Sequence, residues 1–160
     1  AEITADLRDS VSREAGPIVL VPVLTGAVVF TADLVRHIPL KMAIEPVTIG
    51  SYPGRSTESQ GAEIKSALPT DLAGAHVLVA DDILDSGRTL GLLRRVIEAQ
   101  RPASLRIAVL LSKRKSRAES VEVDYAAFEI ADEFVVGYGL DYDGYHRNLP
   151  DIAVLRTGQE

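Results

Sequence analysis

The sequence predicts an α/β protein built on an open, mostly parallel twisted sheet flanked by helices. Three segments, 18–24, 76–80 and 104–111, are almost continuously apolar, as are strands buried on both faces of a parallel sheet. Helical patterns lie between them, and this strand–helix–strand order gives parallel neighbours joined by right-handed crossovers. In sheets of this kind the ligand lies at the carboxyl ends of the strands.

The first part of the chain alternates helix and strand. Apolar residues recur at helical spacing from Ile3 to Val11, and the Gly16-Pro17 pair ends that helix before strand 18–24. Gly26 then turns the chain into a second helix. Apolar residues repeat there every four positions, at Phe30, Leu34 and Ile38.

Segment 42–52 predicts the next strand, although Pro46 disfavours a central position in the sheet. The polar segment 51–63, rich in Gly, Ser and Thr, follows it. This segment is interpreted either as a mobile functional loop or as a plain linker between strands.

The second half repeats the alternation. Strand 76–80 leads into a helix with an apolar face over 90–97, which ends at Arg101-Pro102. Strand 104–111 comes next, and the basic run 113–117 follows at its carboxyl end. Two further extended segments are predicted, 123–130 and 133–142.

Composition restricts the class of protein. The 160 residues fit one domain over 1–160, and a net charge of −6 argues against a nucleic-acid partner. No apolar run approaches the ~18 residues of a membrane helix, so no membrane partner is expected. The chain has no cysteine, which excludes disulfides and thiolate catalysis and fits the cytoplasm, where we expect the protein.

The segment VLVADDILDSGRTL, residues 77–90, joins a buried strand to a helix through an acidic turn. Its spacing matches neither a Walker loop, nor a dinucleotide fingerprint, nor a calcium loop. We expect its backbone N–H groups to converge on one phosphate at the helix N-terminus, with the hydroxyls of Ser86 and Thr89 as further donors. The predicted phosphate-binding residues are Asp85, Ser86, Gly87, Arg88 and Thr89.

A phosphate alone would be repelled by the carboxylates of Asp81, Asp82 and Asp85. The ligand must therefore also carry groups that a carboxylate can bind. A carboxylate only accepts hydrogen bonds, whereas sugar hydroxyls donate them. Ribose 5-phosphate satisfies both requirements, with its hydroxyls at Asp81 and Asp82, and a nearby magnesium ion would turn the repulsion into attraction. The alternative is a capping turn, which one Asp would favour but three acids do not.

These residues resemble a known family. The apolar strand, the two acids and the Asp-Ser-Gly-x-Thr turn are similar to the phosphoribosyl pyrophosphate signature of type I phosphoribosyltransferases. Segments 21–38, 110–114 and 134–150, with Ser51-Tyr52, resemble the hypoxanthine-guanine phosphoribosyltransferases of the purine branch. The similarity runs from about residue 18 to about residue 155.

The resemblance implies transfer of the 5-phosphoribosyl group from phosphoribosyl pyrophosphate to N9 of a 6-oxopurine, with Mg²⁺ as cofactor. It assigns the ribose hydroxyls to Asp81 and Asp82 and the 5-phosphate to residues 85–89. Asp85 would be catalytic, as proton acceptor near the purine N7 and as stabiliser of an oxocarbenium-like transition state. Asp141 would hold the metal, with Asp81 and Asp82 as further candidates.

The same resemblance implies a base site. Lys113 would donate to the purine O6, Phe134 would stack on the ring, and Val135 would offer backbone groups to the pyrimidine edge, with Asp141 close by. Phe134, Val135 and Asp141 belong to a C-terminal hood segment, about 134–160, whereas Lys113 lies outside it.

The remaining implied residues handle the leaving group and closure. Ser51 and Tyr52 would head the mobile loop, about 51–63, that excludes water from the site. Thr25 stands where many relatives carry Lys. The implied pyrophosphate-binding residues are Leu24, Thr25, Gly26 and Arg147.

Residue physics alone leaves plainer interpretations open. Lys113 begins a basic run of a kind that is usually solvated surface. Phe134 beside two valines is typical of a core, and Asp141 near Gly144 is typical of a turn. Arg147 is equally compatible with an ordinary surface ion pair.

Two other functions also remain open: a regulator of the same fold that senses phosphoribosyl pyrophosphate, and a phosphoribosyltransferase for another base. Asp85 and Phe134 favour the purine enzyme over the regulator, and Lys113 together with 134–142 favours it over a uracil or orotate enzyme. The order of preference among hypoxanthine, guanine and xanthine stays open. The oligomeric states common in the family imply a homodimer or homotetramer.

Overall fold

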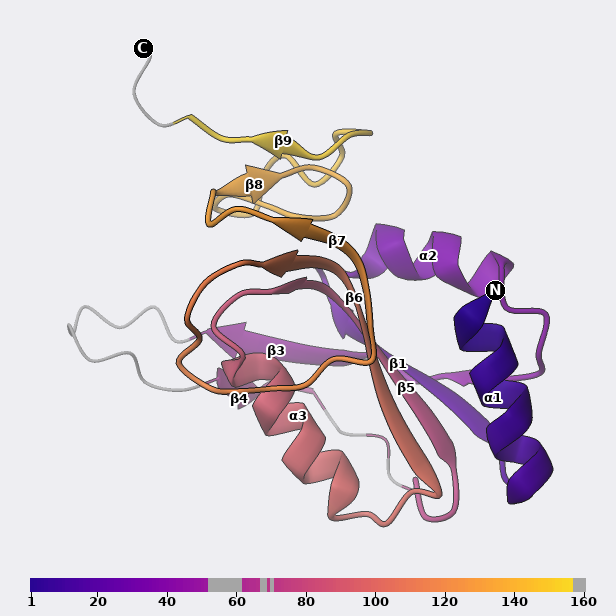
Figure 1. Ribbon diagram of the computed structural model, residues 1–160. Helices are drawn as coiled ribbons and strands as arrows, with labels where there is room; N and C mark the ends of the chain where they lie inside the picture. The colour runs from indigo at the N-terminus through magenta and orange to yellow at the C-terminus, as the bar shows by residue number, and fades with distance from the viewer. Residues whose placement is uncertain (52–61, 67–68, 70, 157–160) are drawn as a thin grey trace.

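The computed structural model describes residues 1–51, 62–66, 69 and 71–156 (Figure 1). The helices are α1 (Glu2–Arg13), α2 (Val28–Arg36) and α3 (Arg88–Glu98). The strands of the main sheet are β1 (Ile18–Leu24), β2 (Ala43–Ile44), β3 (Val47–Ser51), β4 (Ala62–Ile64), β5 (His76–Leu84), β6 (Ser104–Lys113) and β7 (Tyr125–Ile130). A small second sheet pairs β8 (Val135–Val136) with β9 (Ala153–Val154).

The main sheet confirms the predicted mostly parallel topology. Its strand order within the described residues is β4-β3-β1-β5-β6-β7, and β2 also pairs with β1. The pairings of β1 with β2, β3 and β5, of β5 with β6, and of β6 with β7 are parallel. Only β4 runs antiparallel, against β3. The carboxyl ends of β1, β5 and β6 therefore meet at one edge.

Helices cover both faces of this sheet, with α3 on one side and α1 and α2 on the other (Figure 1). Val77 and Val79 of β5 belong to the apolar cluster that contains the inner residues of α3. Leu78 and Ala80 belong to the cluster that contains Leu7 of α1. This alternation is the period of two expected of a strand, and it explains why the segment is apolar on both faces.

Strand β5 is longer than the sequence predicted. Asp81 pairs with Val109 in the ladder, and the register continues to Leu84 opposite Ser112. The two acids therefore lie within the strand rather than in the turn after it. The reason is that β6 itself continues to Lys113 and supplies ladder partners to this length.

Two other predicted strands are shorter than expected. Segment 42–52 is split by Glu45-Pro46 into β2 and β3, because proline has no N–H for the ladder. Segment 133–142 keeps only Val135–Val136 as a strand, since Gly137 and Gly139 have φ of +93° and +101° and turn the chain. The hood segment containing β8 and β9 lies beyond the β7 edge of the sheet (Figure 1). In the part of the chain described, no helix has both the length and the apolar character needed to cross a membrane.

Candidate active site

Many of the predicted site residues lie at or just beyond the carboxyl ends of three neighbouring parallel strands, while Asp81 and Asp82 lie within β5 itself. Leu24 ends β1, Leu84 ends β5, and Lys113 ends β6. The hood reaches the same edge, because a Cβ on Gly139 would lie only 2.2 Å from the carbonyl oxygen of Gly26. The hydroxyl of Tyr138 also donates to Asp33 of α2 and anchors the hood there. The structure thus brings the turn after β1 and the hood together.

Asp81 and Asp82 form a buried acidic pair. Asp81 is 5% exposed, and its Oδ1 accepts a hydrogen bond from the backbone N–H of Asp82 at 2.9 Å. Burial raises the pKa of Asp81 well above its usual value, and the negative charge of Asp82 adds to the shift. Burial also raises the pKa of Asp82, although the charge of Arg147 acts in the opposite direction. A hydrogen-bond donor or a cation brought to this pair would relieve both effects.

Gly26 lies directly against Asp82. A Cβ at position 26 would be 1.8 Å from Oδ2 of Asp82, so only glycine leaves that carboxylate in place. The preceding peptide bond, between Leu24 and Thr25, is cis. Gly26 of the predicted pyrophosphate loop thus lies against Asp82 of the acidic pair, and the neighbouring Thr25 is exposed.

The turn at 85–89 has the geometry of an anion site. Gly87 is the N-cap of α3 with φ of +82°, and in the described structure no side chain caps this helix. Apart from the N–H of Arg88, the first N–H groups of α3 therefore have no side-chain partner from a cap, and the helix dipole places partial positive charge there. The N–H of Arg88 donates to the Ser86 hydroxyl at 3.5 Å.

Asp85 lies in a cluster of four alternating charges with Lys113, Lys115 and Asp132. Lys113 Nζ is 3.2 Å from Asp85 Oδ2 and 3.3 Å from Asp132 Oδ1. Lys115 Nζ contacts the other oxygen of Asp85 and lies 3.1 Å from Asp132 Oδ1. Desolvation tends to raise the pKa of Asp85, but hydrogen bonds from Lys115 and Lys113 outweigh it and lower the pKa. Asp85 is therefore ionised at neutral pH.

The hood carries a second cluster of polar contacts. Arg147 Nη2 is 2.7 Å from Asp141 Oδ1, and its Nη1 donates to the carbonyl of Gly139 at 2.6 Å. The other carboxylate oxygen of Asp141 accepts from the N–H of Gly144 at 2.7 Å. Asp141 therefore shapes a turn, as residue physics alone allowed, and also holds the arginine whose charge acts on Asp82.

Phe134 is an exposed aromatic face rather than a core residue. Its side chain is 49% exposed, and its ring meets that of Tyr142 edge-on, with centroids 5.5 Å apart and planes at 90°. Val135 and Val136 behind it are buried. Lys113 likewise differs from the surface interpretation of its basic run, because its side chain is only 8% exposed.

Several residues of this edge were not predicted from the sequence. Lys115 was assigned to solvated surface, and Asp132, Gly139 and Tyr142 were not singled out. The one available signal was the two-residue spacing of Lys113 and Lys115. Tyr52 lies outside the described residues, and for Ser51 the structure describes only the backbone, which pairs with Ala62.

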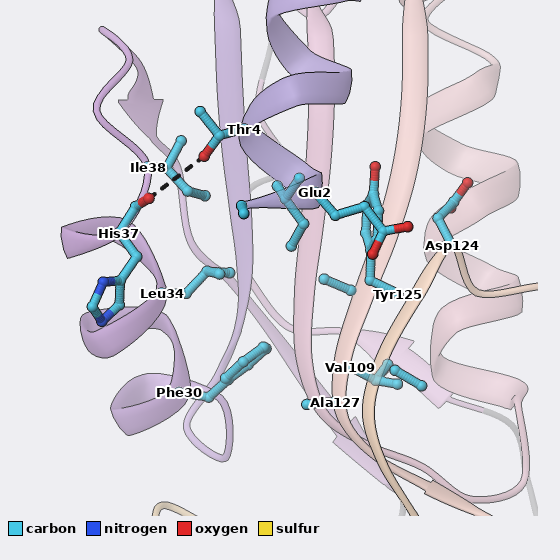
Figure 2. Close-up of a pocket in the computed structure, with 14 residues that line it drawn as sticks. Glu2, Thr4, Phe30, Leu34, His37, Ile38, Val109, Asp124, Tyr125 and Ala127 are labelled. Atoms are coloured by element: carbon cyan, nitrogen blue, oxygen red, sulfur yellow. Dashed lines mark hydrogen bonds between the residues drawn. The ribbon is translucent and has the colours of Figure 1, made fainter.

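A separate cavity of about 410 Å³ lies between α1, α2 and the sheet (Figure 2). Phe30, Leu34, Ile38 and Tyr125 are among its lining residues, and the hydroxyl of Thr4 donates to the carbonyl of His37 at 3.5 Å beside it. Of the predicted site residues that the structure describes, none lines it. It belongs to the α1–α2 face and is distinct from the edge described above.

One edge of the parallel sheet carries the predicted phosphate turn 85–89, the acidic pair, and the loop 24–26 beside that pair. This arrangement is the architecture of a phosphoribosyltransferase. The family model for the phosphoribosyl transferase domain matches residues 1–143. A hypoxanthine-guanine phosphoribosyltransferase from Streptococcus pneumoniae is 43% identical over 138 residues, which cover 86% of this chain and 77% of that protein.

Solved structures give the same result. A hypoxanthine phosphoribosyltransferase from Staphylococcus aureus superposes with a TM-score of 0.84 at 36% identity, covering 97% of this chain and 83% of that one. The Trypanosoma cruzi enzyme in complex with the product IMP gives a TM-score of 0.83 at 35% identity, covering 98% and 87%. The chain belongs to the phosphoribosyltransferase family, in its hypoxanthine-guanine branch.

Proposed function

We propose that this protein is a purine salvage enzyme that transfers the 5-phosphoribosyl group of phosphoribosyl pyrophosphate to N9 of hypoxanthine or guanine, with xanthine as a further candidate. The products are IMP or GMP and pyrophosphate. One observation carries the choice of base: Lys113 Nζ and Asp85 Oδ2 lie 3.2 Å apart at the edge that holds the phosphate turn. An ammonium and a carboxylate side by side complement the adjacent O6 acceptor and N7–H donor of a 6-oxopurine.

The base site follows from this pair. Lys113 donates to O6, and Asp85 faces N7 and the imidazole edge. The exposed ring of Phe134 offers a stacking surface, and its contact with Tyr142 holds the ring plane. Val135 supplies backbone groups to the pyrimidine edge.

The phosphoribosyl site occupies the rest of the edge. Asp81 and Asp82 accept hydrogen bonds from the ribose hydroxyls, and the N–H groups of residues 85–89 bind the 5-phosphate. The loop Leu24-Thr25-Gly26 receives the pyrophosphate through backbone groups, and Arg147 contributes the charge that Thr25 lacks. The closeness of Gly26 to Asp82 supports this arrangement, because it places the ribose and pyrophosphate subsites in contact.

Magnesium fits this donor set. In the part of the chain described, no three acidic or histidine side chains form a ready-made metal cluster. Mg²⁺ commonly needs only one or two protein carboxylates when substrate phosphates supply the other oxygens. Asp81 and Asp82 meet that need, with Asp141 as the proposed third residue, and the bound ion would supply charge neutralisation for the leaving pyrophosphate.

The chemical step uses the protein's own groups for orientation and proton transfer. The N9–C1 bond forms as the C1–O bond to pyrophosphate breaks, and the imidazole proton must leave the base. Asp85 is ionised, so its carboxylate accepts this proton at N7 and later releases it to solvent. Its negative charge also stabilises the oxocarbenium-like transition state.

A panel of bases tests the proposal. Hypoxanthine, guanine, xanthine, adenine, uracil and orotate are each mixed with phosphoribosyl pyrophosphate, Mg²⁺ and the protein, and pyrophosphate release is followed. Release with 6-oxopurines alone is the expected result. Binding of phosphoribosyl pyrophosphate without turnover would favour the regulator instead, and release with uracil or orotate would favour an enzyme for another base.

Assembly and location form the last part of the proposal. We expect a homodimer or homotetramer in the cytoplasm, because the resemblance implies both. One structural relative was studied for the role of its C-terminal region in oligomeric state. Sedimentation of the purified protein measures the oligomer directly.

A further inference from the structure

Lys115 occupies a position that neither the sequence pattern nor the proposed roles account for. Its backbone N–H donates to the carbonyl of Lys113 at 3.1 Å, and this tight turn follows the end of β6. The ammonium groups of Lys113 and Lys115 meet the same two carboxylates. Arg114, between them, donates its backbone N–H to Ile130 and has an exposed side chain outside the cluster.

The two lysines divide the oxygens of Asp85 between them. Lys113 contacts Oδ2, and Lys115 contacts Oδ1. When a purine binds and Lys113 turns to O6, Asp85 loses one of its two cations. Lys115 remains on the opposite oxygen, and it is the second charge that holds this carboxylate.

Asp132 extends the connection to the hood. It lies two residues before Phe134, and its Oδ1 is 3.1 Å from Lys115 Nζ. Lys115 therefore joins Asp85, which follows the end of β5, to the start of the segment that carries the aromatic ring of Phe134. Its side chain is 28% exposed, so water screens this contact only in part.

We propose that Lys115 is a positioning residue of the phosphoribosyl transfer: its ammonium holds Asp85 and Asp132 in place when Lys113 leaves them for the purine O6. The inference rests on the proposed function. Without Lys115, the cluster would have two carboxylates and one cation. Lys113 already contacts both Asp85 and Asp132. It would then be the one cation that holds them, and its move to O6 would leave both carboxylates without it.

The test compares Lys115→Gln, Lys115→Arg and the control Arg114→Gln with the wild type. All four proteins are assayed with hypoxanthine and phosphoribosyl pyrophosphate, varying each substrate in turn. Lys115→Gln should raise KM for hypoxanthine about three- to fivefold, the upper part of the range for partly exposed charge pairs, and leave KM for phosphoribosyl pyrophosphate within about twofold. Lys115→Arg should restore KM for hypoxanthine, because a guanidinium keeps the charge and can reach two carboxylates.

The pH profile separates positioning from a general structural role. The cations facing Asp85 are Lys113 and Lys115, and Asp132 faces both of them. Lys115 lowers the pKa of Asp85, so its removal raises that pKa. Since the reaction needs ionised Asp85, the acid limb of kcat/KM should move to higher pH in Lys115→Gln and return in Lys115→Arg.

The outcomes distinguish the inference from the function beneath it. If the wild type uses no 6-oxopurine, the proposed function fails. If the wild type is active and Lys115→Gln keeps both its KM for hypoxanthine and its acid limb, only the role of Lys115 fails. An equal shift in Arg114→Gln would also overturn that role, because the effect would then come from net charge.

Discussion

The turn 85–89 requires a glycine at position 87, because the neighbouring backbone leaves no room for a Cβ atom. Gly87 caps α3 with φ of +82°, and a Cβ there would lie 2.1 Å from the carbonyl oxygen of Glu119. Gly74 is its matched control, because it has φ of +67° but nothing within 4 Å of an added Cβ. Gly87→Ala and Gly74→Ala therefore share the left-handed backbone cost and differ in the collision.

The expected costs follow from these contacts. The left-handed conformation costs a non-glycine residue about 1–2 kcal/mol, and this is the whole expected loss for Gly74→Ala. In Gly87→Ala the Glu119 backbone must also move, although its N–H donates to the carbonyl of Ser86 at 3.0 Å. Weakening that hydrogen bond and its packing adds about 1–2 kcal/mol, so the total loss is about 2–4 kcal/mol.

Denaturant unfolding and steady-state kinetics measure the two effects. The free energy of unfolding should be about 1–2 kcal/mol lower for Gly87→Ala than for Gly74→Ala. Only Gly87→Ala should raise KM for phosphoribosyl pyrophosphate, by about tenfold for each 1.4 kcal/mol of lost phosphate binding. Equal stability and equal KM in the two variants would refute the reasoning that the Glu119 segment and the turn are tightly packed.

Three further outcomes test the proposed chemistry. Excess chelator should abolish turnover, because the leaving pyrophosphate would face Asp81 and Asp82 without a cation; full activity in chelator contradicts this. Asp85→Asn should lower kcat by about 10²–10⁴ and preserve binding of phosphoribosyl pyrophosphate, whereas near-normal turnover would mean that the proton goes elsewhere. The kcat/KM for adenine should be about 10⁴–10⁵-fold lower than that for hypoxanthine, and Lys113→Gln should make this difference smaller. If the difference is the same in Lys113→Gln as in the wild type, Lys113 does not select the base.

The sequence identified the acids of the proposed ribose site by their residue type but not by their position in the fold. Two adjacent carboxylates after an apolar run indicated a sugar or metal site, and Asp81 and Asp82 indeed form a buried pair. Where β5 ends could not be predicted, because strand length depends on its neighbour. The ladder continues past the acids only because β6 extends to Lys113.

The basic run after β6 shows a different limit. By itself, the segment from Lys113 to Arg117 is typical of solvated surface, and the family resemblance singled out only Lys113. The pairing of Lys115 with Asp85 and Asp132 joins residues from the ends of three strands. No local sequence pattern predicts these long-range contacts, because each of the three residues by itself is typical of an ordinary surface charge.

The sequence by itself determined the features that depend on residues close to one another along the chain. Apolar runs predicted the buried parallel strands, helical spacing predicted α1 to α3, and the Asp-Ser-Gly-x-Thr turn predicted a helix N-terminus suited to a phosphate. What only the tertiary structure decided is which distant groups touch. Gly139 lies against Gly26, Lys115 binds Asp85 and Asp132, and these contacts arise because packing at one sheet edge selects partners whose separation along the chain carries no signal.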